Sequence, residues 1–168
     1  MGYHGEVLDQ CGLIDIDCSQ IAVVAVSGDG PNVCGHLLLY TGPSRGGYYF
    51  HVAGEWKGHP RYMSETGYRR YLREAGKVEL RRIYLSLPNA RGALQYLEGL
   101  MANTWTWLVL PNNCVSFVEE VIKAGGGTWS SYTNCPAVAT QDTLRERIER
   151  FVGQLENAIY KLYGVPIF

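Results

Sequence analysis

The sequence predicts a single domain of the α+β class over residues 1–168. Short segments rich in β-branched and aromatic residues lie close together in the first half of the chain, and turn residues between them favour antiparallel pairing. Segments with apolar residues at helical spacing follow and alternate with them. No repeat, low-complexity tract or linker divides the chain, and 168 residues suffice to bury one sizeable core.

Composition argues against two classes of partner. Fifteen Lys and Arg residues stand against sixteen Asp and Glu, and the net charge of −1 provides no dominant attraction to nucleic acid or anionic membranes. No apolar run approaches the ~20 residues of a membrane helix, so we expect no integral membrane association. The one basic run predicts a solvated helix and strand face, and it comprises Arg69, Arg70, Arg73, Lys77, Arg81 and Arg82.

The first 20 residues predict an irregular N-terminal arm with at most a short strand around Leu13 and Ile14. They do not form a signal peptide, so we expect synthesis in the cytoplasm and export only by a dedicated machine. Residues 21–26 are a β-branched run closed by a glycine-rich turn, which predicts a strand.

Two further strands, over 35–40 and 47–53, predict an antiparallel hairpin because turn residues separate them. This hairpin places His36 opposite His51 or one diagonal step from it, on the same face of the sheet. Two histidines that meet in this way can divide the work of catalysis, since one imidazole acts as a base while the other orients it.

Residues 54–62 predict a loop. Ser64 then caps a helix that ends near Ala75, a strand follows over 78–85, and Asn89 caps a second helix.

An extended segment over 104–110 leads into a polar turn and an amphipathic helix that ends at Gly125. Cys114 lies in the first turn of this helix, where unpaired backbone N–H groups and the helix dipole favour a thiolate. We therefore expect a lowered pKa and a nucleophilic sulfur near neutral pH. A buried structural cysteine is the alternative.

Residues 128–139 predict a loop that forms a lid or the wall of a cleft, and 140–163 predict a C-terminal helix whose apolar stripe packs on the core. The chain has five cysteines, at positions 11, 18, 34, 114 and 135, without the spacing of a zinc site. For a protein that folds in the cytosol we expect all five to be reduced, with one nucleophile and two disulfides as the alternative.

The order His36, His51, Cys114 resembles the circularly permuted branch of the NlpC-type papain-like superfamily, which includes lecithin:retinol acyltransferase-like proteins and permuted bacterial amidases. The matching segments are Gly35-His36-Leu37-Leu38-Leu39-Tyr40-Thr41-Gly42, similar to that family's His-x-x-x-Tyr-x-Gly strand, and Asn113-Cys114-Val115-Ser116-Phe117-Val118. The resemblance covers residues 20 to 125. It implies a papain-like fold, with a central antiparallel sheet packed by helices and a catalytic cysteine at a helix N-terminus.

The resemblance also implies a cysteine hydrolase. His36 would deprotonate Cys114, His51 would fix the tautomer of His36, and the sulfur would attack a carbonyl to form an acyl-enzyme, without a metal or organic cofactor. The backbone N–H of Cys114 is the first candidate for an oxyanion donor. Three side chains could add another: Asn112, Asn113 and Tyr40.

Val115 and Ser116 stand where the acyltransferase relatives carry Glu-His, and the chain lacks their hydrophobic C-terminal anchor. Both departures favour a soluble amidase or peptidase over lipid chemistry. Type VI secretion effectors are similar in size and lack of a targeting sequence, so we expect an antibacterial toxin that cleaves peptidoglycan peptides in the target periplasm and meets a cognate immunity protein. The alternatives are a phospholipid acyltransferase or lipase, a protein-directed protease or deamidase, and a non-enzymatic interaction module.

Overall fold

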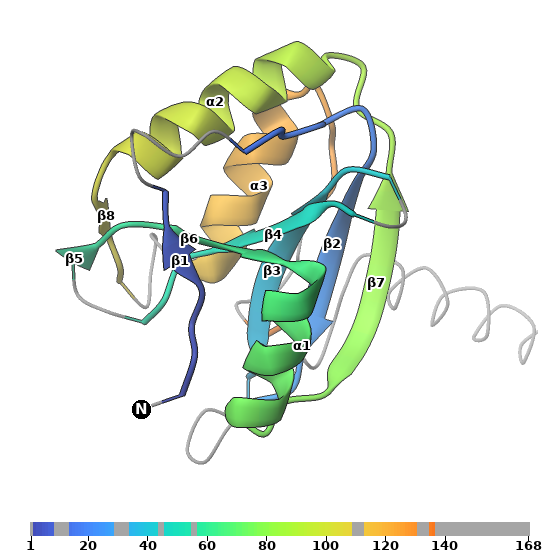
Figure 1. Cartoon of the computed structure of the whole chain (residues 1–168). Helices are drawn as coiled ribbons and strands as arrows, with labels where there is room; N and C mark the ends of the chain where they lie inside the picture. The colour runs from blue at the N-terminus through green and yellow to red at the C-terminus, as the bar shows by residue number, and fades with distance from the viewer. Residues whose placement is uncertain are drawn as a thin grey trace, which may run out of the picture.

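The computed structural model describes residues 2–8, 14–28, 34–43, 46–54, 57–108, 113–130 and 135–136. Within these residues the chain forms an α+β fold, which confirms the predicted class. A six-stranded antiparallel sheet separates helix α1 (Glu65–Glu74) on one face from α2 (Ala90–Ala102) and α3 (Cys114–Ala124) on the other (Figure 1).

The strand order in the sheet is β1-β6-β4-β3-β2-β7, and β5 and β8 form a separate two-stranded ladder. The strands are β1 (Glu6–Val7), β2 (Ile21–Val26), β3 (His36–Thr41), β4 (Tyr48–His51), β5 (Lys57–Gly58), β6 (Arg61–Ser64), β7 (Glu79–Leu85) and β8 (Trp105–Thr106). Strand β2 lies between β3 and β7, with helices over both faces, and all six of its residues are buried. This position explains its continuous apolar sequence.

Strands β3 and β4 form the predicted hairpin. Leu39 pairs with Phe50, and the same register places His51 opposite Leu38 and one diagonal step from His36. Of the two predicted registers, the diagonal one is therefore confirmed.

The predicted helix starts are also confirmed. The hydroxyl of Ser64 accepts a hydrogen bond from the N–H of Gly67 at 3.3 Å and caps α1. The side chain of Asn89 accepts one from the N–H of Gly92 at 2.9 Å and caps α2. Each cap satisfies a backbone donor that the first helical turn leaves without a partner.

Two predictions about irregular segments are wrong. The strand of the N-terminal arm is β1 at Glu6–Val7 rather than around Ile14, because these two residues pair with β6. Strands β5 and β6 occupy much of the predicted loop over 54–62, since β6 pairs with β4 on one side and β1 on the other. The predicted helix over 140–163 and most of the predicted loop over 128–139 lie outside the described residues.

Each face of the sheet has its own buried core. The core under α2 and α3 is aliphatic and aromatic, and it includes Val23, Leu37, Leu39, Phe50, Phe117 and Val118. The core under α1 is rich in tyrosine, and it includes Val24, Leu38, Tyr40, Tyr49, Tyr68 and Tyr71.

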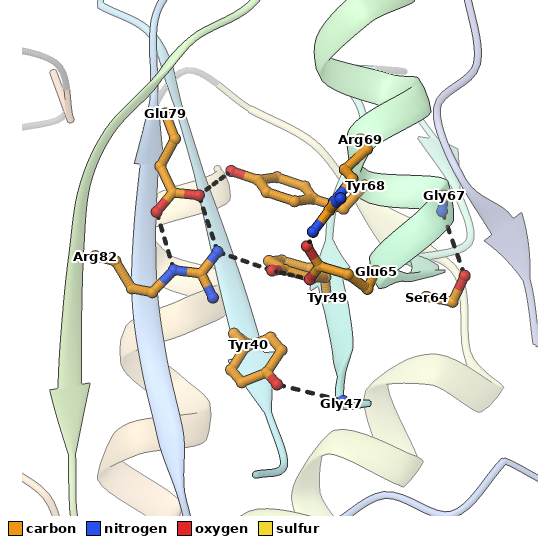
Figure 2. Close-up of polar contacts among 10 residues, drawn as sticks. All are labelled: Tyr40, Gly47, Tyr49, Ser64, Glu65, Gly67, Tyr68, Arg69, Glu79 and Arg82. Atoms are coloured by element: carbon orange, nitrogen blue, oxygen red, sulfur yellow. Dashed lines mark hydrogen bonds and ion pairs between the residues drawn. The ribbon is translucent and has the colours of Figure 1, made fainter. Parts of the chain in front are cut away.

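A hydrogen-bonded network runs along the α1 face, as Figure 2 shows. Arg82 donates two hydrogen bonds of 2.9 Å to Glu79 and one of 2.7 Å to the hydroxyl of Tyr49. Tyr49 donates in turn to Glu65 at 2.7 Å, and Tyr68 donates to Glu79 at 2.7 Å. The predicted solvated basic face is therefore wrong for Arg82, because aromatic rings and a carboxylate enclose its guanidinium.

Cys34 and Cys135 form a disulfide, so the expectation of five reduced cysteines is wrong. Within the described part of the chain, Cys18 and Cys114 remain free thiols, and both are buried. None of the helices in this part has the length and apolar character needed to cross a membrane.

Candidate active site

Cys114 is the first residue of α3, as predicted. The side-chain oxygen of Asn113 accepts hydrogen bonds from the N–H groups of Val115 at 2.9 Å and Ser116 at 3.2 Å. The hydroxyl of Ser116 accepts from the N–H of Asn113 at 2.8 Å, which completes a capping box. These bonds fix the backbone on both sides of the thiol, whose residue is only 8% exposed.

The predicted lowering of the Cys114 pKa is wrong. Burial raises the pKa of the Cys114 thiol above its ordinary value. Hydrogen bonds from the backbone N–H groups of Leu37, Cys114 and Val115 act in the opposite direction, as expected for a helix start, but their effect is smaller. The sulfur is therefore a thiol near neutral pH and becomes a nucleophile only when a base removes its proton.

The structure brings the two predicted histidines together. Nε2 of His36 lies 2.9 Å from Nδ1 of His51, and the two rings meet edge to face. Nε2 of His51 lies 2.8 Å from the backbone carbonyl oxygen of His4.

These contacts determine where the ring protons reside. A carbonyl oxygen only accepts, so Nε2 of His51 carries the proton that it donates to His4. Nδ1 of neutral His51 is then an acceptor, and it takes a hydrogen bond from Nε2–H of His36. In neutral His36 the remaining nitrogen, Nδ1, therefore carries a lone pair and can act as a base.

Both imidazoles are neutral at neutral pH. Burial, reinforced by the neighbouring His51 and by Lys77, holds the pKa of His36 well below its ordinary value. Burial likewise lowers the pKa of His51 to about 4, although the hydrogen bond to His4 acts in the opposite direction. A neutral imidazole is the form that can accept a proton from a thiol.

The thiol and the histidine pair approach the sheet from opposite faces. Cys114 belongs to the core under α2 and α3, together with Leu37. His51 packs against Tyr71 of α1, and the strand alternation places His36 on that same face. Among the described residues no hydrogen bond joins Cys114 to either histidine. The sulfur instead contacts the backbone N–H of Leu37, the residue next to His36.

Tyr40, a predicted oxyanion donor, has another role in this structure. Its hydroxyl donates to the carbonyl of Pro43 and accepts from the N–H of Gly47 at 3.2 Å. A Cβ at position 47 would lie 2.0 Å from the carbonyl oxygen of Thr41, so only glycine fits there. Tyr40 thus holds the turn between β3 and β4. Asn112, a further candidate, lies outside the described residues.

Sequence reasoning missed three contributors to the site. The carbonyl of His4 and the amide of Leu37 are backbone groups, which leave no signature in the residue type. Lys77 is only 8% exposed and donates to the carbonyl of Ser27 at 3.3 Å, so the predicted solvated basic face is wrong for this residue as well. In the described part of the chain, no group of three or more His, Cys, Asp or Glu side chains could hold a metal ion.

No protein-family model, curated protein or solved structure matches the chain. The resemblance to the permuted papain-like proteins therefore depends on the motifs around His36, His51 and Cys114.

Proposed function

We propose that this protein is a cysteine hydrolase that cleaves an amide bond through an acyl-enzyme, with Cys114 as the nucleophile and His36 as the base. The observation that best supports this proposal is the hydrogen-bonded series from the His4 carbonyl through His51 to His36. This series leaves a single basic nitrogen, Nδ1 of His36. The next residue, Leu37, contacts the Cys114 sulfur through its backbone N–H.

In the proposed reaction Nδ1 of His36 takes the thiol proton as the sulfur bonds to the carbonyl carbon of the substrate. The protonated imidazole then donates this proton to the leaving amine, and water hydrolyses the thioester to release the acid. The backbone N–H groups of Leu37 and Cys114 that now face the sulfur are suited to stabilise the oxyanion. The proposed reaction requires the imidazole and the sulfur, which approach the sheet from opposite faces, to meet at the start of β3 when substrate binds. Catalytic contacts often tighten only in that complex.

We assign the substrate to the peptide part of bacterial peptidoglycan, and the protein to a type VI secretion effector that acts in the target periplasm and is held in check by an immunity protein. The disulfide between Cys34 and Cys135 supports a place of action outside the cytosol, because disulfides persist in oxidising compartments such as the periplasm. The permuted papain-like motifs support amide chemistry at a thiol.

The test is to incubate purified peptidoglycan with wild type, Cys114→Ala and His36→Ala and to identify the products by mass spectrometry. Cys18→Ala is the matched control, since Cys18 is the other buried free thiol of the described chain. We expect new muropeptides with wild type and Cys18→Ala and none with Cys114→Ala. Turnover by folded Cys114→Ala would falsify the nucleophile assignment.

A second arm distinguishes the substrate classes in living bacteria. We expect lysis when the protein is directed to the periplasm of a sensitive strain and none when it is retained in the cytoplasm. Toxicity confined to the cytoplasm would indicate a protein substrate instead. Fatty acids released from phospholipid vesicles, with muropeptides intact, would indicate lipid acyl chemistry.

A further inference from the structure

The disulfide lies beside the candidate active site. Cys34 is two residues before His36, the first residue of β3, and Val26 of β2 pairs with His36 at this end of the sheet. The sulfur of Cys114 contacts the amide of Leu37, one residue further along the same strand. The covalent bond therefore attaches at the end of the sheet that carries His36 and the Leu37 amide that the Cys114 sulfur contacts.

The other half of the disulfide comes from the chain that follows α3. After α3 the described chain over residues 125–130, here called the return segment, lies beside the helix: Ser130 donates a hydrogen bond of 2.8 Å to Glu119, and Trp129 is buried in the same core as Cys114. Cys135 then bonds to Cys34. The disulfide thus joins the strand that carries the base to the segment that covers the helix of the nucleophile.

We propose that the Cys34–Cys135 disulfide is an activating switch: oxidation of this pair fixes the return segment beside His36 and Cys114 and makes the hydrolase active, whereas the reduced protein is latent. This inference rests on the proposed function. It means that the enzyme stays inactive in the reducing cytosol of the cell that makes it and becomes active in the oxidising periplasm.

Formation of the Cys34–Cys135 disulfide requires an external oxidant. Cys34 and Cys135 together lose two protons and two electrons as the S–S bond forms, and an incoming disulfide, such as glutathione disulfide or that of a thiol oxidoreductase, is reduced to two thiols. The two other described cysteines do not compete readily, since Cys18 and Cys114 are buried, whereas Cys34 and Cys135 are half-buried. Burial also raises the pKa of Cys18 to about 11, which keeps it a thiol.

The first arm of the test measures peptidoglycan hydrolysis by wild type after oxidation with glutathione disulfide, after reduction with a phosphine, and after reoxidation. We expect activity to fall by about tenfold or more on reduction, because loss of positioning at a reacting pair is costly, and to return on reoxidation. Cys34→Ser and Cys135→Ser should show the low activity in every condition, and Cys18→Ser should respond as wild type does. Circular dichroism at the assay temperature establishes that each form remains folded.

The second arm does not depend on hydrolysis. Mass spectrometry measures the rate at which iodoacetamide alkylates Cys114 in oxidised wild type, in Cys135→Ser and in Cys18→Ser. The return segment covers the core that holds Cys114, so we expect alkylation to be about tenfold faster in Cys135→Ser and unchanged in Cys18→Ser. Equal hydrolysis by oxidised and reduced wild type would overturn the switch, as would equal alkylation in all three proteins. Faster alkylation of Cys135→Ser without hydrolysis by any form would contradict the proposed function alone.

Discussion

His36 and His51 depend on each other through the location of a single ring proton. His51 directs this proton by accepting from Nε2 of His36 while its own Nε2 donates to the carbonyl of His4. A water molecule can partly replace an acceptor of this kind, whereas nothing replaces the base itself.

We therefore expect His36→Ala to reduce kcat by about a hundredfold or more and His51→Ala by about tenfold. His59→Ala, a change at an exposed histidine outside the hydrogen-bonded series, is the control and should retain wild-type turnover. The measurement is the initial rate of muropeptide release by folded protein. A greater loss in His51→Ala than in His36→Ala would mean that the two roles are reversed.

The burial of His36 and His51 makes the stability of the fold depend on pH. An unfolded chain protonates histidine below about pH 6.5, whereas burial lowers the pKa of His51 to about 4 and that of His36 well below its ordinary value. The unfolded state therefore binds more protons in this range, and stability that is present at neutral pH is lost as the pH falls from about 6.5 towards 4. We expect a lower Tm at about pH 5 than at about pH 7.5, and a smaller difference in His51→Gln. Identical Tm values for wild type at both pH values would contradict this.

At the scale of elements, the start of α3 positions Cys114, the proposed nucleophile. The capping box of Asn113 and Ser116 fixes the turn that presents Cys114. Asn113→Ala should lower the free energy of unfolding by about 1 kcal/mol, measured by urea titration, and should also reduce turnover. Asn89→Ala removes the equivalent cap of α2 and is the matched control: we expect a similar loss of stability with little change in activity. Equal turnover in the two variants would show that the cap of α3 has no role in positioning the thiol.

Local chemistry explains which elements the sequence revealed. The caps at Ser64 and Asn89 were predictable because a side-chain oxygen and a nearby backbone N–H determine them within one turn. The hairpin of β3 and β4 was predictable because its turn residues restrict the register. Strands β5 and β6 were missed because pairing partners elsewhere in the chain define them, not their own residue pattern.

The site was predictable in its residue types and less so in its energetics. His36 and His51 were found because a period of two along neighbouring strands brings them to one face. The raised pKa of Cys114 depends on how deeply the fold buries the sulfur, which a helix-start argument does not include. The Cys34–Cys135 bond depends on a contact across 101 residues, for which spacing gives no signal.

At the scale of the whole molecule, this separation of 101 residues makes the disulfide a major constraint on the unfolded chain. In the chain-entropy model a loop of this length contributes about 4.7 kcal/mol to stability. We expect Cys34→Ser to lower the Tm of oxidised protein markedly, by calorimetry, whereas reductant should have little further effect on the variant. An unchanged Tm in Cys34→Ser would show that the unfolded chain is already restricted without the bond.

The two cores divide the candidate site between them. Cys114 belongs to the core under α2 and α3, and the histidine pair belongs to the tyrosine-rich face under α1. Changes within one core therefore act directly on one side of the candidate site, and the backbone of β3 links the two sides, because Leu37, whose N–H contacts the Cys114 sulfur, follows His36.

The disulfide also makes most of the protein a covalent ring. Its closure at Cys34 and Cys135 encloses every strand from β3 to β8 and all three described helices, and it leaves β1 and β2 outside. A protease that cuts once inside the ring opens it without releasing a fragment. On a denaturing gel the singly cut chain would therefore migrate as one species until a reductant separates it into two, so the nicked protein would pass for an intact one in any preparation examined without reductant.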